Sequence, residues 1–314
     1  MNSPSSPYRD LYKGSTFLAV GEVHDVQKEE LERTIDDFGR SGIRLRHVPA
    51  LTSGLCDEIG STIREVFVLR QEGGIVDQQG RLITLSTRER IEHCLAHPHD
   101  TGPNVPDLNA AGRKALGVAR DVLEAGAGRA AVTSPALVRR EVDEWQGAGT
   151  LIYDEHLLHR RPIRSEDREI VRYVMHDLIA KKHFRERPGE EEELLRHHHV
   201  LDAKGILGGA SLLPWQKGDY EFARLWTGHI RNGLGCEILT MLKDRWSQQP
   251  DARRLFALTK YKAKEGEQSL YEKKGFELLG QISSLRDDRS LPPQIREYDT
   301  PGRDPFVYMF TQPK

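Results

Sequence analysis

Short apolar runs alternate with amphipathic segments through the first half of the chain, and this alternation decides the class of fold. The runs have the length of buried strands, and four of them are Phe17–Val20, Ile43–Val48, Val66–Leu69 and Arg129–Val132. A hairpin is expected to end with a further strand at Arg81–Thr84. Leu31, Ile35 and Phe38 recur at helical spacing, and a longer helix is expected within residues 107–125. Strands that alternate with helices predict an α/β fold whose sheet is at least partly parallel.

The second half of the chain predicts a mixed α/β sheet. Its expected strands are Ile206–Leu213, Tyr220–Thr227, Leu255–Leu258, Phe276–Leu279 and Phe306–Phe310. Helices are expected to start at Ser165, to cover residues 235–246, and to cover Glu265–Lys274. A polar, basic stretch separates the halves, so we predict one domain over residues 1–152 and a second over residues 153–314.

Charge and cysteine content argue against several classes of protein. Lys and Arg number 46 and Asp and Glu number 48, and the resulting net charge of −2 gives no electrostatic footprint for nucleic acid. No apolar run approaches the ~20 residues of a membrane helix. The three cysteines, Cys56, Cys94 and Cys236, are too few and too widely spaced for a disulfide framework or a cysteine zinc site. We therefore expect a soluble, cytoplasmic protein without a bound metal and without nucleic-acid or membrane partners.

The sharpest local motif is a glycine turn between an apolar strand and an amphipathic helix. It consists of Arg231, Asn232, Gly233, Leu234, Gly235 and Cys236. Glycines let backbone N–H groups approach an anion closely, and the start of a helix adds the positive end of its dipole. The motif predicts a phosphate-binding turn, and the same residues also suit an ordinary strand-to-helix connection.

A second motif lies at Ser269–Phe276, where a helix end, a glycine C-cap and a strand follow one another. In this order and at this separation, the two motifs resemble the GNAT acyltransferase superfamily. The resemblance implies that acetyl-CoA is the co-substrate and that the glycine turn holds its pyrophosphate. It also implies that Tyr271 donates a proton to the departing thiolate.

Further segments, in order along nearly the whole chain, resemble the bacterial N-acetylglutamate synthases, in which an amino-acid-kinase-like domain precedes a GNAT domain. They include Lys13–Phe17, Ser41–Leu45, Gly147–Ile152, Leu212–Pro214 and 291–309. A central block of the kinase-like domain is missing between Ala50 and Leu51. The first strand is followed by Gly21-Glu22, without the lysine of an active kinase. The resemblance therefore implies a shortened, non-catalytic kinase-like α/β domain followed by a mixed-sheet GNAT acyltransferase domain.

The same resemblance supplies candidate substrate and catalytic residues. The family's glutamate-binding arginines fall on Arg187 and Arg303, whose planar guanidinium groups suit carboxylates. For each of them, a solvated surface charge is the alternative. A serine of the family near the second arginine is replaced by Pro305, which offers no hydroxyl. The base that removes the amine proton falls on Asp219 or Glu221, which share one strand face, with a strand-edge charge as the alternative.

The resulting prediction is an amino-acid N-acetyltransferase that converts acetyl-CoA and glutamate into CoA and N-acetylglutamate, as in arginine biosynthesis. Two alternatives stay open: a GNAT enzyme for another amino acid or amine, and an inactive acyl-CoA-binding regulatory module. We expect a small amino-acid substrate and a homo-oligomer. His197–His199 are interpreted as surface residues at a helix end, because three consecutive imidazoles rarely converge on one metal ion.

Overall fold

The chain folds into two compact units, which we describe separately. The structure, a computed structural model, describes residues 9, 12–97, 100, 106, 108–187, 189, 191–228, 233–260, 269–298 and 304–311. The first unit holds the chain up to His159 and the segment Asp202–Ile206. The second unit holds Arg160–Leu201 and Leu207–Thr227 and continues from Gly233. Within the described ranges, no helix is both long enough and apolar enough to cross a membrane.

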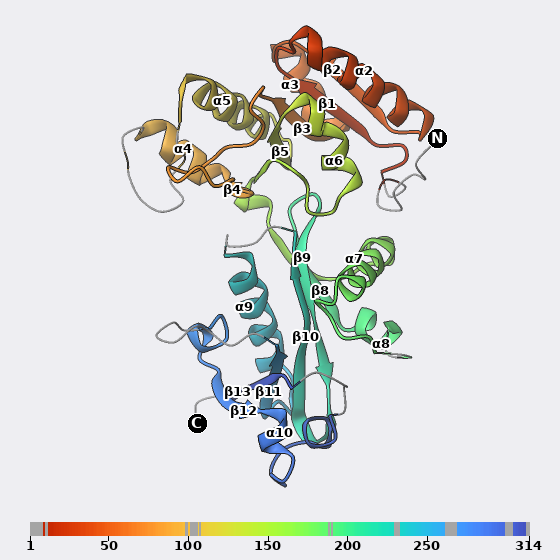
Figure 1. Ribbon diagram of the computed structural model, residues 1–314, viewed down its shortest axis with the longest axis vertical. Helices are drawn as coiled ribbons and strands as arrows, with labels where there is room; N and C mark the ends of the chain where they lie inside the picture. Colours follow the sequence, from red (N-terminus) through yellow and green to blue (C-terminus); the bar gives the residue numbers. More distant parts are fainter. Residues whose placement is uncertain are drawn as a thin grey trace. The chain divides into compact units, whose positions relative to one another are not determined.

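A six-stranded sheet forms the centre of the first unit (Figure 1). Its strands are β1 (Thr16–Val20), β2 (Arg44–Val48), β3 (Ile63–Leu69), β4 (Leu85–Thr87), β5 (Arg129–Thr133) and β6 (Thr150–Tyr153), in the order β2-β1-β3-β5-β6-β4. Strands β2, β1, β3 and β5 pair in parallel, β5 pairs with β6 antiparallel, and β6 pairs with β4 in parallel. The partly parallel α/β sheet expected from the sequence is therefore confirmed.

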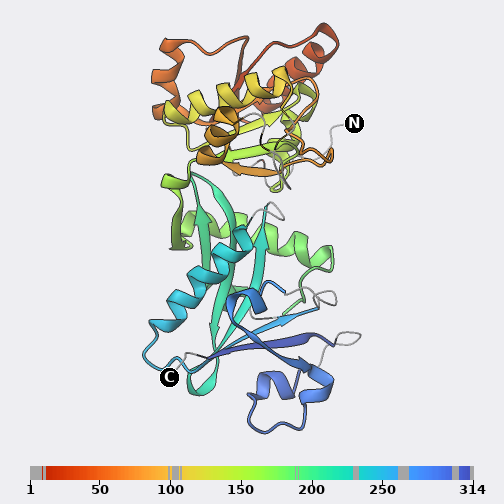
Figure 2. The same ribbon diagram turned by 90° about the vertical axis from the view of Figure 1, so that its left-hand side faces the viewer.

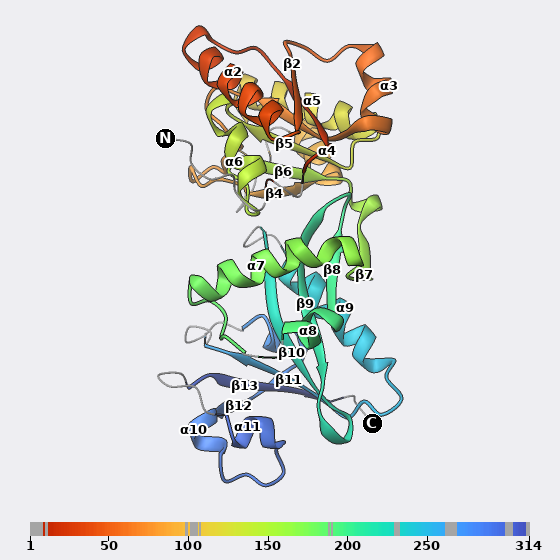
Figure 3. The same ribbon diagram turned by 90° about the vertical axis from the view of Figure 1, so that its right-hand side faces the viewer.

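Successive strand residues point to opposite sides of this sheet, and the central strands are buried at nearly every position. Helices therefore cover both faces. The helices are α2 (Asp25–Arg40), α3 (Ser53–Thr62), α4 (Arg88–Ala96), α5 (Ala110–Glu124) and α6 (Val138–Asp143). Leu18, Val66 and Val132 belong to a core built with α3, α4 and α5. Phe17 and Phe67 point the other way and stack at 5.5 Å, on the side covered by α2 and α6 (Figure 3).

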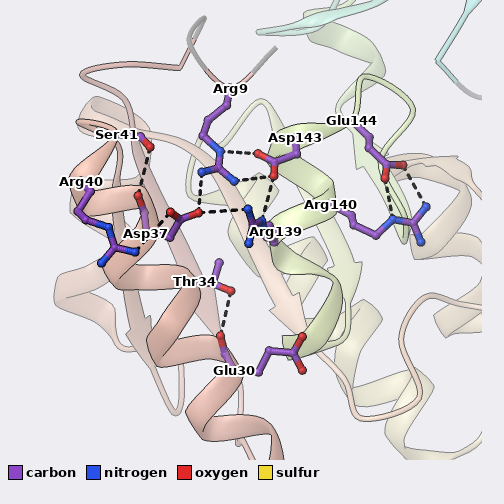
Figure 4. Close-up of polar contacts among 10 residues, drawn as sticks. All are labelled: Arg9, Glu30, Thr34, Asp37, Arg40, Ser41, Arg139, Arg140, Asp143 and Glu144. Atoms are coloured by element: carbon purple, nitrogen blue, oxygen red, sulfur yellow. Dashed lines mark hydrogen bonds and ion pairs between the residues drawn. The ribbon is translucent and has the colours of Figure 1, made fainter. Parts of the chain in front are cut away.

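A buried arginine joins the two helices on that second side (Figure 4). The Arg9 side chain is 3% exposed; it pairs with Asp143 on α6 at 2.6 and 2.5 Å and with Asp37 on α2 at 2.6 Å. Arg139 lies 3.5 Å from Asp37 and 3.2 Å from Asp143. Arg40 also lies 3.5 Å from Asp37. The two carboxylates compensate the buried guanidinium of Arg9.

Glu141, also on α6, is enclosed by the loop at residues 147–149. A Cβ on Gly147 would lie 2.6 Å from one carboxylate oxygen, and a Cβ on Gly149 would lie 2.9 Å from the other. The backbone N–H of Ala148 donates to the carboxylate at 3.1 Å. Burial, with a smaller contribution from Glu65, raises the pKa of Glu141 to about 7.

We expect Glu141 to lower the stability of the fold as pH rises. The folded protein holds a proton on Glu141 up to about pH 7, whereas the unfolded chain releases it near the ordinary pKa of 4.5. Raising the pH through that window therefore favours unfolding. As pH rises from about 5 to about 8, the unfolding free energy of wild type should fall by on the order of 2 kcal/mol relative to that of Glu141→Gln. Urea unfolding at both pH values checks this, and an equal difference at the two would contradict it.

A seven-stranded mixed sheet forms the second unit. Its strands are β7 (His159–Pro162), β8 (His198–Asp202), β9 (Ile206–Pro214), β10 (Asp219–Thr227), β11 (Arg254–Thr259), β12 (Glu277–Gln281) and β13 (Phe306–Thr311), in the order β12-β13-β11-β10-β9-β8-β7. Strand β10 is antiparallel to β9 and parallel to β11, and β13 is antiparallel to β11 and β12. The mixed sheet expected for this half is confirmed.

Helices lie on both faces of the second sheet. They are α7 (Arg168–Ala180), α8 (Glu191–Arg196), α9 (Leu234–Ser247), α10 (Ile282–Leu285) and α11 (Pro293–Arg296). Helices α7 and α8 cover one face of β8–β10 (Figure 3), and α9 covers the opposite face (Figure 2). Ile238, Leu242 and Trp246 are buried on the inner side of α9, as the helical periodicity of the sequence predicts.

One prediction in the first unit needs correction, and two of its helices, α3 and α4, were not predicted. Arg81–Thr84 forms an isolated bridge between Leu82 and Val76 rather than a strand of the sheet. Helix α4 was not predicted, because Ile91 and Cys94 are its only buried residues, and so its apolar stripe is short.

Two other predictions stay open. The first four residues of the helix expected at Glu265–Lys274 lie outside the described residues, and of the other six only Glu272–Lys274 are helical, as a single 3-10 turn. Strand β6 ends at Tyr153, one residue past the expected domain boundary. The limits 1–152 and 153–314 therefore stay a prediction.

Candidate active site

Strands β10 and β11 pair at one end and not at the other. Their parallel register runs from Asp219 with Arg254 to Phe222 with Ala257. Strand β10 nevertheless continues for five more residues, and β11 for two. The ladder between these two central strands is therefore interrupted, and backbone groups beyond the last pair can bind a ligand.

A β-bulge shapes the same part of β10. The register with β9 shifts between Ala223 and Trp226, and Arg224 inside the bulge has a φ of 57°. This left-handed conformation is unusual for a residue with a side chain. A bulge takes one residue out of the ladder and redirects its side chain. Here that residue is Arg224, which is 9% exposed and lies with its guanidinium 5.2 Å from the ring centre of Phe184.

Helix α9 begins beside this part of β10. Its N-cap, Gly233, has a φ of 88°, and the first helical hydrogen bond ends on the Gly233 carbonyl at 3.1 Å. The N–H groups of Gly235 and Cys236 precede the donor of that bond, so the helix ladder does not use them. A Cβ on Gly235 would lie 3.5 Å from Leu270 and 4.0 Å from Leu225 of β10. The helix start, the end of β10 and the segment before Tyr271 therefore meet at Gly235.

The glycine turn predicted from the sequence is only partly described. Arg231 and Asn232 lie outside the described residues. Leu234 is 1% exposed and contributes its side chain to the core. The backbone of Gly233, Gly235 and the following residue is the part of the turn that can face an anion.

Tyr271 lies in an aromatic cluster next to the start of α9. Its ring centroid is 6.1 Å from that of Phe222, 5.7 Å from that of Phe276 and 5.1 Å from that of Tyr308. Burial, with smaller contributions from Tyr308 and Glu221, raises the pKa of Tyr271 well above its ordinary value. The hydroxyl therefore stays protonated at neutral pH, and the Glu221 carboxylate lies within electrostatic range of it.

Each of the two candidate bases on β10 binds an arginine. Asp219, which is 3% exposed, accepts hydrogen bonds from Nε and Nη2 of Arg254 at 2.8 and 2.5 Å. Glu221, also 3% exposed, accepts one from Nη1 of Arg187 at 2.9 Å and a second from Nη2. Arg254 also donates to the Ser290 carbonyl at 2.7 Å. The two pairs are similar in form, but their arginines lie in different surroundings.

A pocket of about 420 Å³ lies between α7, α8 and β10. Met175, Ile179 and Leu194 supply apolar lining. Arg187 and Arg224 supply positive charge, and Glu186 and Glu191 supply negative charge. This volume and this mixture of charges suit a small ligand that carries both a positive and a negative group. Arg187 therefore lines the pocket and also binds Glu221. The other predicted substrate arginine, at position 303, lies outside the described residues.

The chain is similar in structure to solved acetyltransferases. No protein-family profile matches the sequence, and no curated protein matches it either. N-acetylglutamate synthase from Neisseria gonorrhoeae, solved with coenzyme A and N-acetyl-glutamate, is 15% identical, covers 98% of this chain and 97% of its own, and has a TM-score of 0.41. The same enzyme with coenzyme A and L-arginine is 18% identical over 88% of this chain and 63% of its own, with a TM-score of 0.46.

A GNAT-family acetyltransferase from Staphylococcus aureus is 12% identical over 49% of this chain and 98% of its own, with a TM-score of 0.37. The TM-scores of these three structures are 0.46 or less, so the similarity does not identify a substrate or site residues of this chain. The roles of the residues rest on the geometry described above.

The interpretation of residues 197–199 as surface histidines is wrong for His198. This side chain is fully buried on β8, accepts a hydrogen bond from Trp226 Nε1 at 3.1 Å and donates through Nδ1 to Ser211 at 2.8 Å. Ser211 in turn donates to the Leu194 carbonyl at 3.0 Å. Burial lowers the pKa of His198 to about 3, so the ring is neutral. The network joins β10 to α8, which lines the pocket.

Tyr308 is a residue of the site that sequence reasoning missed. It is fully buried on β13, stacks on Tyr271, and its hydroxyl has no hydrogen-bond partner among the residues that the structure describes. A buried hydroxyl without a partner is uncommon and marks a place that a ligand can complete. No local pattern could reveal it, because the stacking needs the sheet to be assembled.

Proposed function

We propose that the protein is an N-acetyltransferase that transfers the acetyl group of acetyl-CoA to the α-amine of glutamate. One observation carries the proposal: the start of α9, the end of β10 and the segment of Tyr271 meet around Gly235. Backbone anion donors, a strand with an interrupted ladder and a protonated phenol are thereby brought together. Acyl transfer from a thioester needs these three groups, to bind the donor, polarise its carbonyl and protonate its sulfur.

Two features of the second unit suit the binding of acetyl-CoA: the start of α9 and the backbone groups of β10 beyond its last pair with β11. The 14-residue helix α9 offers the N–H groups of Gly235 and Cys236 and the positive end of its dipole to a pyrophosphate. The interrupted ladder of β10 offers backbone N–H groups to a thioester carbonyl. When bound, acetyl-CoA supplies the activated acetyl group.

We propose Glu221 as the base in preference to Asp219, because Glu221 binds the pocket residue Arg187, whereas Asp219 binds Arg254, which is not part of the pocket lining described above. Glu221 accepts a proton from the substrate ammonium, and the freed lone pair attacks the thioester carbonyl. A backbone N–H of β10 polarises the carbonyl oxygen. As the C–N bond forms and the C–S bond breaks, Tyr271 gives its proton to the sulfur. The second amine proton restores Tyr271, and Glu221 releases its proton to water.

Tyr271→Phe should lower turnover by about 100-fold and leave acetyl-CoA affinity near wild type, because the ring is kept and the proton donor is lost. Steady-state CoA release and calorimetry measure the two quantities. Full turnover in the variant, under conditions where chemistry limits the rate, would remove Tyr271 from the mechanism.

We propose that Arg187, Arg224 and Arg303 bind the acceptor's carboxylates, since the guanidinium fork matches a carboxylate. Arg187 and Arg224 both line the pocket. A second candidate function keeps the chemistry and changes the acceptor to another amino acid or amine. Pro305 supports it, because this residue offers no hydroxyl where the related synthases have a serine.

For the remainder of the chain we propose a shortened, non-catalytic kinase-like domain over residues 1–152, followed by the acetyltransferase domain over residues 153–314. The protein would act as a cytoplasmic homo-oligomer in arginine biosynthesis. The alternative of an inactive acyl-CoA-binding module would need neither Tyr271 nor Glu221 in its present surroundings.

CoA release from acetyl-CoA, measured with each common amino acid, tests the proposal. Glutamate should give the fastest release. Faster release with another amino acid would favour the second candidate function. Acetyl-CoA binding without release for any amino acid would favour the inactive module.

A further inference from the structure

The ion pair between Arg187 and Glu221 connects substrate binding with base catalysis. Arg187 lines the acceptor pocket, and Glu221 is the proposed base. The arginine fork holds both carboxylate oxygens, and the two side chains are 12% and 4% exposed. A carboxylate whose two oxygens are both bound to a guanidinium presents that cation, and not a free oxygen, to an incoming ammonium. In this arrangement Glu221 is not ready to deprotonate an amine.

We propose that an α-amino acid opens this ion pair and thereby activates its own acetylation; the inference rests on the proposed function. The acceptor's α-carboxylate replaces Glu221 on Arg187, and its ammonium replaces Arg187 beside Glu221. Every buried charge keeps a partner of opposite sign, so the exchange avoids an isolated buried charge. The ammonium then gives its proton to Glu221, which the guanidinium no longer holds.

The pocket wall carries two further carboxylates, Glu186 and Glu191. Glu191 of the pocket wall is already bound by an arginine of α7 and by His176 at 2.9 Å, so it does not compete for the ammonium. Arg224 supplies a second cation for a further carboxylate of the acceptor. The inference therefore names a substrate class, since an acceptor must carry a free carboxylate next to its amine. Amines and α-carboxamides lack the group that opens the pair.

The pair of Asp219 with Arg254 is a matched control. Asp219 lies on β10, two residues before Glu221, and Arg254 also binds both oxygens of its carboxylate. Arg254 binds the Ser290 carbonyl and is not part of the pocket lining described above. Opening this second pair should therefore leave the choice of acceptor unchanged.

Acceptor selectivity in the full chain tests the exchange. CoA release is measured at saturating acetyl-CoA with L-glutamate and with its α-carboxamide, isoglutamine. Wild type should prefer glutamate by on the order of 100-fold in kcat/KM. Arg187→Gln should lose this preference: the value for glutamate falls by a similar factor, while the value for isoglutamine stays level or rises. Arg254→Gln should keep the wild-type preference. An equal fall for both acceptors in Arg187→Gln, or an unchanged preference, would overturn the exchange.

A measurement on the wild type avoids any folding defect of the variants. Acetate supplies in trans the carboxylate that isoglutamine lacks, so it should raise CoA release with isoglutamine several-fold, whereas sodium chloride at equal ionic strength should not. No stimulation by acetate would count against the exchange, even if glutamate is a good acceptor. If the wild type binds acetyl-CoA and releases no CoA with any amino acid, the proposed function fails and the exchange fails with it.

Discussion

Gly235→Asp is expected to abolish measurable acetyl-CoA binding while helix α9 stays folded. An aspartate in the first turn of a helix suits the helix dipole, so the fold should tolerate it. Its carboxylate would compete for the N–H groups of Gly235 and Cys236 and would repel a pyrophosphate. We expect acetyl-CoA affinity to fall by on the order of 100-fold or more, measured by calorimetry.

Gly235→Ala is the matched control for that variant. Its Cβ would make ordinary contacts at 3.5 Å with Leu270 and 4.0 Å with Leu225, so the added methyl group fits. The alanine variant should keep much more of the affinity than the aspartate variant, at similar thermal stability. Unchanged CoA affinity in a folded Gly235→Asp protein would remove the start of α9 from the proposed site.

Glu221→Gln should give the largest loss of turnover, on the order of 1,000-fold, with little change in acetyl-CoA affinity. The amide cannot accept the ammonium proton, so the reaction depends on acceptor that is already deprotonated. Activity of the variant should therefore rise with pH towards the pKa of the acceptor's amine, more steeply than in the wild type. Steady-state kinetics across pH measure both effects.

Asp219→Asn separates the two carboxylates of β10. Asp219 binds Arg254 rather than the pocket residue Arg187. Its loss should therefore lower the free energy of unfolding and have only a small effect on the rate. We expect a rate loss below about 10-fold, against the 100-fold or more that removal of a general base causes. The reverse order of rate losses would make Asp219 the base.

The elements that build the site were predictable because their signals are local. The apolar run Tyr220–Thr227 lies within β10, and the helix expected at residues 235–246 is α9, at Leu234–Ser247. Strand alternation, glycine positions and helical spacing act over a few residues, so they survive in a single sequence. The α/β class and the mixed second sheet follow from the same signals.

The charges of the site could not be predicted in this way. Arg187 and Glu221 are 34 residues apart in the sequence and form an ion pair only after β10 and the segment that follows α7 have packed together. Arg224 reaches the pocket because of a bulge, which no residue type announces. His198 looked exposed beside two other histidines, yet in a strand adjacent side chains face opposite sides. Burial and pairing across the fold decide the roles of these residues.

Quantifying CoA and N-acetylglutamate in the same reaction tests the central claim most directly. Wild-type protein with acetyl-CoA and glutamate should form the two products in equal amounts, and neither should form when glutamate is left out. Acetyl-CoA that binds tightly and yields CoA without N-acetylglutamate, or yields neither product, would contradict glutamate N-acetylation by this protein.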